Sequence, residues 1–502
     1  MKNVFLLHGV YKKTFFYLLA YSILFIFPII LANVYYIDDV GRLMNGIATW
    51  QHDGRPLMYM IANVFSNGKL LMPVFPVPMF LAVVLLSYIL VVYAKKYFPH
   101  GSAFTLSICL GISFCNLFLV ENFSYIFESF GMIFSLSIFI GLFVICEDLK
   151  NKRNIAISVF LCVCSLSTYQ AALGGYIGLA AIEAGRMIFQ SRKYKDIIWQ
   201  VVMRGILLCA GMVIYKLVIA NQFIKGYADV HGEIVNVLSI SGIHTMKLNL
   251  VIFLHTFKDF FISLGTGPSL IITGLIVLGT FLICKDFCKS QSYGKKWKVI
   301  GCAYFVFLPS FLMFSSIFPY LFLAHPVFAS RVFLSVTIFT LYIGFLMLYV
   351  GKRSKYVYVC GLFLLLSNCT FSATYGTVLN REYQHEQQMA YFIVNDINHI
   401  ENQTNKKYGK ITFVGKAPRS YELQLTEKHK PLLRMLVPVY YSGDWFWGGK
   451  YIQHYRTMVV KSAKLTNDDK KMIESTRPSR KNEFYGMYAN GDKIIVVFPS
   501  VN

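Results

Sequence analysis

Long uncharged runs separated by short basic loops decide what this chain can fold into. A membrane-spanning helix needs about 20 mostly apolar residues, and runs of this kind recur from near the N-terminus to residue 377. They predict spans over 14–35, 77–94, 102–120, 128–146, 197–220, 266–284, 299–319, 332–350 and 356–377. The sequence therefore predicts a polytopic α-helical membrane protein.

The stretch 154–182 carries no charge and is long for one span but short for two. Its middle, residues 165–170, is polar, and Gly174-Gly175 follows. We therefore expect two short helices with a break near Thr168. The break brings the predicted total to about eleven transmembrane helices.

The net charge of +23 lies mostly in the loops between the apolar runs. Such a charge is one sign of nucleic-acid binding, but the cytoplasmic loops of membrane proteins carry the same excess of Lys and Arg. With eleven spans, every loop on the N-terminal side is basic: 95–101, 147–153, 186–196, 285–298 and 351–355. The pattern argues for a cytoplasmic N-terminus and against nucleic-acid binding. A ten-span variant would put the basic loop 285–298 outside, so we reject it.

An odd number of spans places the polar tail on the outer side. Residues 382–400 have helical spacing of the apolar positions Met389, Phe392, Ile393, Ile397 and Ile400. In contrast, 410–415 and 493–498 are typical of strands. The sequence predicts a transmembrane domain over 1–379 and a soluble, periplasmic α+β domain over 380–502. All eleven cysteines precede the tail and none has zinc-type spacing, so no metal site is expected.

An acidic pair, Asp38 and Asp39, follows the first apolar run, with Arg42 one turn later. Carboxylates at a lipid–water boundary are costly to desolvate and usually mark a function. We interpret them as catalytic, with one carboxylate taking the proton of an attacking sugar hydroxyl. A solvated helix end and a partner for Arg42 are the alternatives. No cofactor is required; a divalent ion on the pair stays open, although no third ligand is evident.

Basic side chains near the outer ends of the spans are candidates to neutralise the phosphate of a lipid-linked sugar donor. Arginine suits this role because its planar fork makes paired hydrogen bonds to phosphate. The candidates are Arg42, Arg55, Arg331, Lys69 and Lys216. Interfacial snorkelling is the alternative for Arg331, and it is the expectation for Arg204 within the span 197–220.

A third group is predicted to hold the sugar or the acceptor. Glu128 begins a span, Tyr169 and Gln170 lie in the predicted break, and Trp445 and Trp447 lie in an aromatic stretch of the tail. Aromatic rings stack on the C–H faces of sugars, and polar side chains bind their hydroxyls. The alternatives are a helix-dipole role for Glu128 and membrane-interface anchoring for the tryptophans.

Several short motifs resemble the serotype-converting O-antigen glucosyltransferase family of bacterial and phage membrane proteins. They are Asp38-Asp39-x-x-Arg42, Gly54-Arg55-Pro56-Leu57, Ser124-Tyr125-x-x-Glu128-Ser129, Ser167-Thr168-Tyr169-Gln170 and Ser330-Arg331. The resemblance implies a GT-C-like fold with its active site on the periplasmic side. It also implies a polyprenyl-phosphate-glucose donor and a lipid-linked O-antigen acceptor.

We therefore predict a membrane glycosyltransferase that transfers glucose or a related hexose from a polyprenyl-phosphate donor to a lipid-linked surface glycan. Its predicted location is the bacterial inner membrane. A glycolipid flippase or transporter is the first alternative, but it would need charged groups near the bilayer midplane. An O-antigen polymerase or ligase is the second.

Overall fold

The computed structural model describes residues 2–289, 293–443, 445–456, 458 and 460–499. The chain divides into two compact units. The first consists of Met1–Ile30 with Ile47–Ala373, and the second of Leu31–Gly46 with Thr374–Asn502. The short segment that carries the acidic pair thus belongs to the same unit as the tail.

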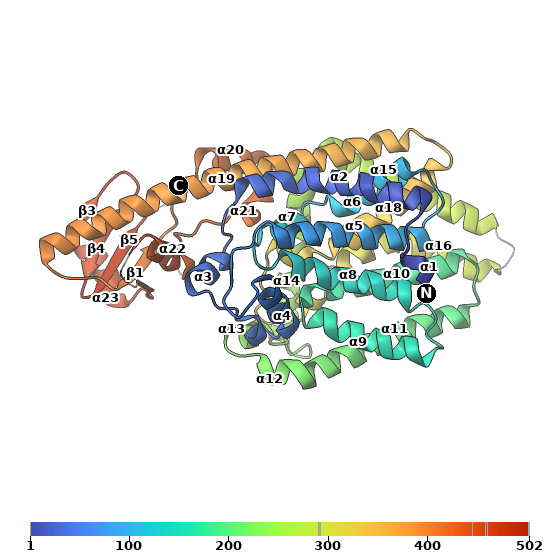
Figure 1. Cartoon of the computed structure of the whole chain (residues 1–502), viewed down its shortest axis with the longest axis horizontal. Coiled ribbons are helices and arrows are strands. Elements are labelled where there is room, and N and C mark those ends of the chain that lie inside the picture. Colours follow the sequence, from blue (N-terminus) through green and yellow to red (C-terminus); the bar gives the residue numbers. More distant parts are fainter. Residues whose placement is uncertain (1, 290–292, 444, 457, 459, 500–502) are drawn as a thin grey trace. The chain divides into compact units, whose positions relative to one another are not determined.

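The first unit is built almost entirely of helices (Figure 1). In chain order they are α1 (Lys2–Phe5), α2 (Gly9–Ala32), η1 (Trp50–Asp53), α4 (Pro56–Phe65), α5 (Val77–Tyr97), α6 (Ala103–Phe114), α7 (Leu119–Ser124), α8 (Ser129–Ile145), α9 (Lys152–Leu166), η2 (Gln170–Ala172), α10 (Leu173–Phe189), α11 (Tyr194–Tyr215), η3 (Lys216–Ala220), α12 (Asn221–Phe223), α13 (Tyr227–His231), α14 (Ile240–Leu264), α15 (Thr266–Lys289), α16 (Lys295–Ser315), α17 (Phe318–Leu321), η4 (Ser330–Phe333) and α18 (Val336–Gly351). The helix α19 (Val357–Thr404) begins in this unit and continues into the second.

Seven helices in the described part of the chain are long and apolar enough to cross a membrane. They are Gly9–Ala32, Val77–Tyr97, Gln170–Phe189, Tyr194–Phe223, Thr266–Lys289, Lys295–Ser315 and Val357–Thr404. Shorter apolar helices, among them α6, α8 and α18, match further predicted spans. The structure is therefore that of a membrane protein, and the count of eleven spans stays a prediction.

The predicted break near Thr168 is confirmed. The helix α9 ends at Leu166, and α10 begins at Leu173 after the short turn η2. The Ser167 hydroxyl donates to the Val163 carbonyl at 2.6 Å and the Thr168 hydroxyl donates to the Cys164 carbonyl at 2.8 Å. Such bonds to the preceding turn occupy the last carbonyls of α9 and help it to end there.

Close helix packing holds the first unit together. The helices α5, α8, α9 and α11 lie side by side (Figure 1), and α6 packs on α18. Gly174 lies directly against the backbone of Ser315 in α16, where a Cβ atom would collide with the carbonyl oxygen. A larger residue at position 174 would therefore force α10 and α16 apart.

Arg204 does not snorkel toward the interface as expected. Its side chain is 1% exposed and makes two hydrogen bonds of 2.8 Å to the carboxylate of Glu183 in α10. The guanidinium also lies 4.2 Å from the centre of the Phe143 ring. The snorkelling interpretation was wrong because Arg204 has a buried partner on another helix. A charge buried in this way needs such a partner.

The second unit contains α3 (Asp38–Asn45) and the polar part of α19, followed by a five-stranded sheet with short helices. These elements are β1 (Lys410–Val414), α20 (Tyr421–His429), α21 (Leu433–Leu436), α22 (Trp447–His454), β2 (Lys461–Ser462), α23 (Asn467–Ser475), β3 (Arg480–Lys481), β4 (Gly486–Asn490) and β5 (Lys493–Val497). The strand order is β2-β1-β5-β4-β3, and β1 runs parallel to both of its neighbours. Both predicted strands are confirmed as β1 and β5.

The predicted helix over 382–400 is confirmed as part of α19, which runs without a break through position 380. Its buried positions Met389, Ile393, Ile397 and Ile400 face the core of the second unit. Phe392 instead is 49% exposed and stacks on the Phe484 ring at 6.1 Å. Tyr36, Val40 and their neighbours pack with the tail, which explains why Leu31–Gly46 belongs to this unit.

Candidate functional site

The acidic pair begins α3 in the second unit. Arg42 lies one turn further along, 3.7 Å from the Asp38 carboxylate and 3.6 Å from that of Asp39. The Asp38 side chain is 34% exposed, whereas that of Asp39 is fully buried. Carboxylates in the first turn are favoured by the helix dipole. Of the two carboxylates, Asp38 is therefore the accessible one, and Asp39 is enclosed beside Arg42.

Contacts with the tail fix the backbone at Ile37, directly before α3. Ile37 has a φ of +46°, a left-handed conformation that a branched side chain rarely adopts. Its N–H donates to the Tyr440 hydroxyl at 2.8 Å, and that hydroxyl donates to the Tyr35 carbonyl at 3.2 Å. Burial raises the pKa of Tyr440, so the hydroxyl keeps its proton. Strain of this kind is held only by surrounding structure and is common at functional sites.

Aromatic rings cover α3 within the same unit. Trp447 of α22 approaches Gly41 so closely that a Cβ there would lie 2.9 Å from its ring. Trp445 stacks on Tyr440 with the rings 5.7 Å apart and nearly parallel. Both tryptophans are partly exposed. The structure therefore brings the predicted carboxylates and the predicted sugar platforms together. Asp444, the first residue of that aromatic stretch, lies outside the described residues.

A second cluster, in the first unit, forms around Arg55. Its Nε donates to Gln170 Oε1 at 2.9 Å, and its guanidinium lies 4.8 Å from the centre of the Tyr169 ring. The Glu128 carboxylate is 3.8 Å away and is buried. Burial alone would lower the pKa of Arg55, but the acidic groups around it, with Glu128 the strongest, together outweigh burial and raise the pKa, which keeps the guanidinium charged. We call Arg55, Glu128, Tyr169 and Gln170 the Arg55 cluster.

Two residues that bond to the Arg55 cluster, Trp50 and Tyr215, were not predicted from the sequence. Trp50 Nε1 donates to the Glu128 carboxylate at 2.6 Å. The Gln170 amide donates to the Tyr215 hydroxyl at 2.8 Å, and that hydroxyl donates to the Gly54 carbonyl at 2.9 Å. Gly54 has a φ of +72°, and a side chain there would collide with Tyr215. No sequence signal points to Trp50 or Tyr215, because each lies far along the chain from its partner.

Arg331 has a carboxylate partner that was also missed. Its guanidinium donates to Glu121 Oε1 at 2.7 Å, and its backbone N–H donates to Glu121 Oε2 at 2.8 Å. The guanidinium is 5.3 Å from the centre of the Tyr125 ring, and the Arg331 carbonyl accepts from the Tyr169 hydroxyl at 3.4 Å. Glu121 is an acid that directly follows the predicted span 102–120, and that signal was available in the sequence.

The two candidate lysines differ from these arginines. Lys69, in the turn after α4, and Lys216, at the start of η3, are both exposed. Among the described residues of the first unit, neither lysine bonds to a member of the Arg55 cluster. Within the described part of the chain there is no group of three or more metal-ligating side chains. Among those described residues, no third protein ligand joins Asp38 and Asp39 for a metal ion.

A comparison with known families identifies the chain. The model of a family described as glucosyl transferase GtrII matches residues 27–349, which is more than half of the sequence. The chain belongs to the GtrII glucosyl transferase family. Both the α3 carboxylates and the Arg55 cluster fall within the matched range, whereas the tryptophans of the tail lie outside it.

A protein of Salmonella phage P22 is 27% identical over 489 residues, which cover 96% of this chain and 97% of that protein. It is described as an uncharacterized 55.3 kDa protein in the gtrB 5′ region. No solved structure matches the chain. The family match confirms the resemblance drawn from the sequence motifs and supports a glycosyltransferase that acts on a sugar donor and a glycan acceptor.

Proposed function

We propose that this GtrII family member transfers glucose from a polyprenyl-phosphate donor to a lipid-linked surface glycan at the outer face of the bacterial inner membrane. The observation that carries the proposal is the family match over residues 27–349. A GT-C-like organisation with eleven spans, a cytoplasmic N-terminus and a periplasmic tail is part of the same proposal. The basic loops support this orientation.

In the proposed reaction, Asp38 takes the proton of the acceptor hydroxyl. The oxygen attacks the anomeric carbon of glucose while the bond from that carbon to the phosphate oxygen breaks. The phosphate leaves on its polyprenyl chain with both electrons of the broken bond. The partly exposed Asp38 carboxylate beside Arg42 supports its role as the base.

Arginine is proposed to neutralise the departing phosphate. Arg55 is held by the Glu128 carboxylate, the Tyr169 ring and the hydrogen bond to Gln170. The guanidinium of Arg331 is held by the Glu121 carboxylate and the Tyr125 ring. These contacts fix the direction of each guanidinium. Groups that are oriented before the reaction lose little entropy when charge develops on the leaving group. Trp445 and Trp447 are proposed to stack on the acceptor glycan.

The identity of the donor is tested in isolated membranes that contain the chain. The membranes receive an acceptor glycolipid and radiolabelled glucose, which is attached either to polyprenyl phosphate or to a nucleotide. The enzyme that converts one donor into the other is absent. We expect label in the glycan only from the lipid donor, with one polyprenyl phosphate released per glucose transferred. Transfer from the nucleotide donor alone would contradict the proposal.

The same experiment separates the alternatives. A flippase or transporter would move the labelled donor without releasing polyprenyl phosphate. A polymerase or ligase would lengthen or relocate the glycan instead of adding single hexoses, which the size of the labelled product reveals.

A further inference from the structure

A cavity of about 330 Å³ lies in the first unit, among the helix ends that carry the basic loops. Its wall includes the last turns of α5, α10 and α18. Arg186 lies near the end of α10, whereas Gln170 of the Arg55 cluster precedes its start. The interval from 170 to 186 corresponds to ~24 Å of helix at about 1.5 Å per residue. The cavity is therefore separate from the Arg55 cluster.

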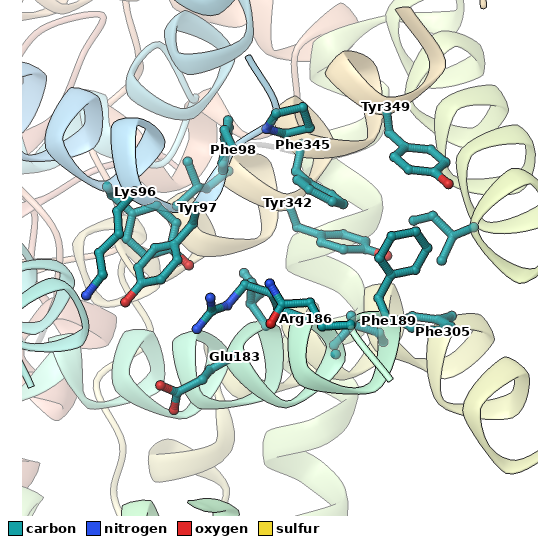
Figure 2. A pocket seen from close by; sticks show the side chains of 18 of the residues that line it. Lys96, Tyr97, Phe98, Glu183, Arg186, Phe189, Phe305, Tyr342, Phe345 and Tyr349 are labelled. Atoms are coloured by element: carbon teal, nitrogen blue, oxygen red, sulfur yellow. The ribbon is translucent and has the colours of Figure 1, made fainter. Parts of the chain in front are cut away.

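One side of the cavity is positively charged. Lys96 and Arg186 line it, and Figure 2 shows both extending to the same side, next to Tyr97. Lys352 also lines the cavity but lies by Tyr349, 5.7 Å from the centre of that ring. Glu147 pairs with Lys96 at 2.8 Å and with Arg186 at 2.6 Å. Two cations against this one carboxylate leave an excess of one positive charge, since the lining Glu183 is neutralised by Arg204.

The rest of the cavity is apolar. Phe189, Phe305, Leu308 and Ile283 form much of this wall. This apolar part does not hold water well, because water needs two or more polar partners. The charged side and the apolar side together match an amphiphile better than a free ion.

Tyr342 supplies an independent sign of a ligand. Its side chain is 4% exposed and lines the cavity, and Figure 2 shows it facing Phe189. Among the described residues, its hydroxyl has no hydrogen-bond partner. Leaving a buried hydroxyl without a partner is costly, so such groups normally meet water or a ligand. A ligand that brings a hydrogen-bond acceptor to this apolar wall would supply the partner.

We propose that this cavity binds an acidic glycerophospholipid. The phosphate lies against Lys96 and Arg186, an ester carbonyl accepts the hydrogen bond of Tyr342, and an acyl chain lies along Phe189 and Phe305. A glycerolipid has this order of groups, with ester carbonyls between a charged head and apolar chains. The inference is independent of the proposed glucosyl transfer.

Lipid binding to the full-length chain tests the proposal. The chain is purified in detergent, depleted of lipid, and titrated with phosphatidylglycerol, with phosphatidylcholine, with an ether-linked phosphatidylglycerol that lacks ester carbonyls, and with inorganic phosphate. Native mass spectrometry counts the bound lipid and thermal unfolding reports its effect. We expect phosphatidylglycerol to bind at least tenfold more tightly than phosphatidylcholine, with the ether lipid in between.

Two variants assign the contacts. Tyr342→Phe should weaken binding of the ester lipid about fivefold, as the loss of one hydrogen bond does, and leave the ether lipid unchanged. Arg186→Gln should weaken both acidic lipids by on the order of tenfold or more, because a charge-assisted bond is lost. Lys285→Gln, an exposed cation of α15 outside the cavity wall, is the matched control and should change neither.

Tyr342→Phe keeps the shape of the side chain and removes an unpartnered hydroxyl, so the lipid-free variant should unfold at or above the temperature of the parent chain. Equal binding of phosphatidylglycerol and phosphatidylcholine would overturn the proposal. So would stabilisation by inorganic phosphate alone, or ester-lipid binding that is unchanged in Tyr342→Phe.

Discussion

Replacement of Arg55 by lysine separates the charge of this side chain from its shape. Lysine keeps a cation beside the buried Glu128 carboxylate, so that carboxylate stays compensated. It loses the planar fork, the Nε bond of 2.9 Å to Gln170 and the face-on contact of 4.8 Å with Tyr169. Any fall in activity therefore reports the orientation of the guanidinium and not the mere presence of charge.

The size of the effect follows from these contacts. A hydrogen bond that involves a charged donor contributes about 1.5–3 kcal/mol. If lysine cannot replace the bond that arginine makes to the leaving phosphate, a loss of ~2 kcal/mol corresponds to about a 30-fold fall in kcat/KM. We expect KM for the donor to change less than kcat, because the charge on the leaving group develops during the reaction.

The assay is transfer of radiolabelled glucose from the polyprenyl-phosphate donor in isolated membranes, with the amount of chain measured in each sample. Arg192→Lys, the same substitution at an exposed arginine, is the control and should stay within about twofold of the parent, as surface changes usually do. Thermal unfolding in detergent confirms that the variants are folded. An Arg55→Lys variant that keeps more than a third of the activity would refute the reasoning.

Three further predictions concern stability. Arg204→Met should lower the free energy of unfolding by about 3–5 kcal/mol because it leaves Glu183 charged and buried. Adding Glu183→Gln should recover part of the lost stability. Thermal unfolding in detergent measures both effects. Gly41→Ala should cost about 1–3 kcal/mol in the second unit by displacing Trp447, and hydrogen exchange of α3 will detect the loss. Burial would raise the pKa of Asp469, but the ion pair with Lys493 and the hydrogen bonds of Thr466 and Asn490 outweigh it and lower the pKa. The stability that Asp469 contributes is therefore present above its unfolded pKa of about 4 and is lost as the pH falls through the lower folded pKa. Asp469→Asn should remove this acid dependence from the hydrogen exchange of β4 and β5. An unchanged pH profile of exchange in the variant would contradict the prediction.

The sequence was informative where one local pattern decides the structure. Apolar runs of sufficient length became helices, and the polar residues around Thr168 ended α9 as predicted. The short apolar, β-branched runs that form β1 and β5 were visible in the same way. Positions of the amphipathic part of α19 were predicted from spacing alone, apart from Phe392, whose ring has an aromatic neighbour on the surface.

Side-chain pairs that join distant parts of the chain could not be predicted from local patterns. Arg204 pairs with Glu183 on another helix, and Arg331 with Glu121 across more than 200 residues of sequence. The Tyr36 hydroxyl donates to the Leu436 carbonyl at 2.7 Å, which ties the acidic pair's segment to the tail across 400 positions. Nothing in the local composition of either segment indicates its partner, because hydrophobicity and charge specify a kind of neighbour and not its position.

The most direct test of the central claim is the rate of glucose transfer by Asp38→Asn. The amide keeps the size of the side chain but cannot take a proton, and loss of a general base costs about 10²–10⁴-fold in rate. Asp468→Asn, an exposed acid in the first turn of α23 of the same unit, is the matched control and should transfer at the parent rate. The account predicts a fall of at least 100-fold in kcat for Asp38→Asn at normal membrane expression. Transfer by Asp38→Asn at the rate of the control would contradict it.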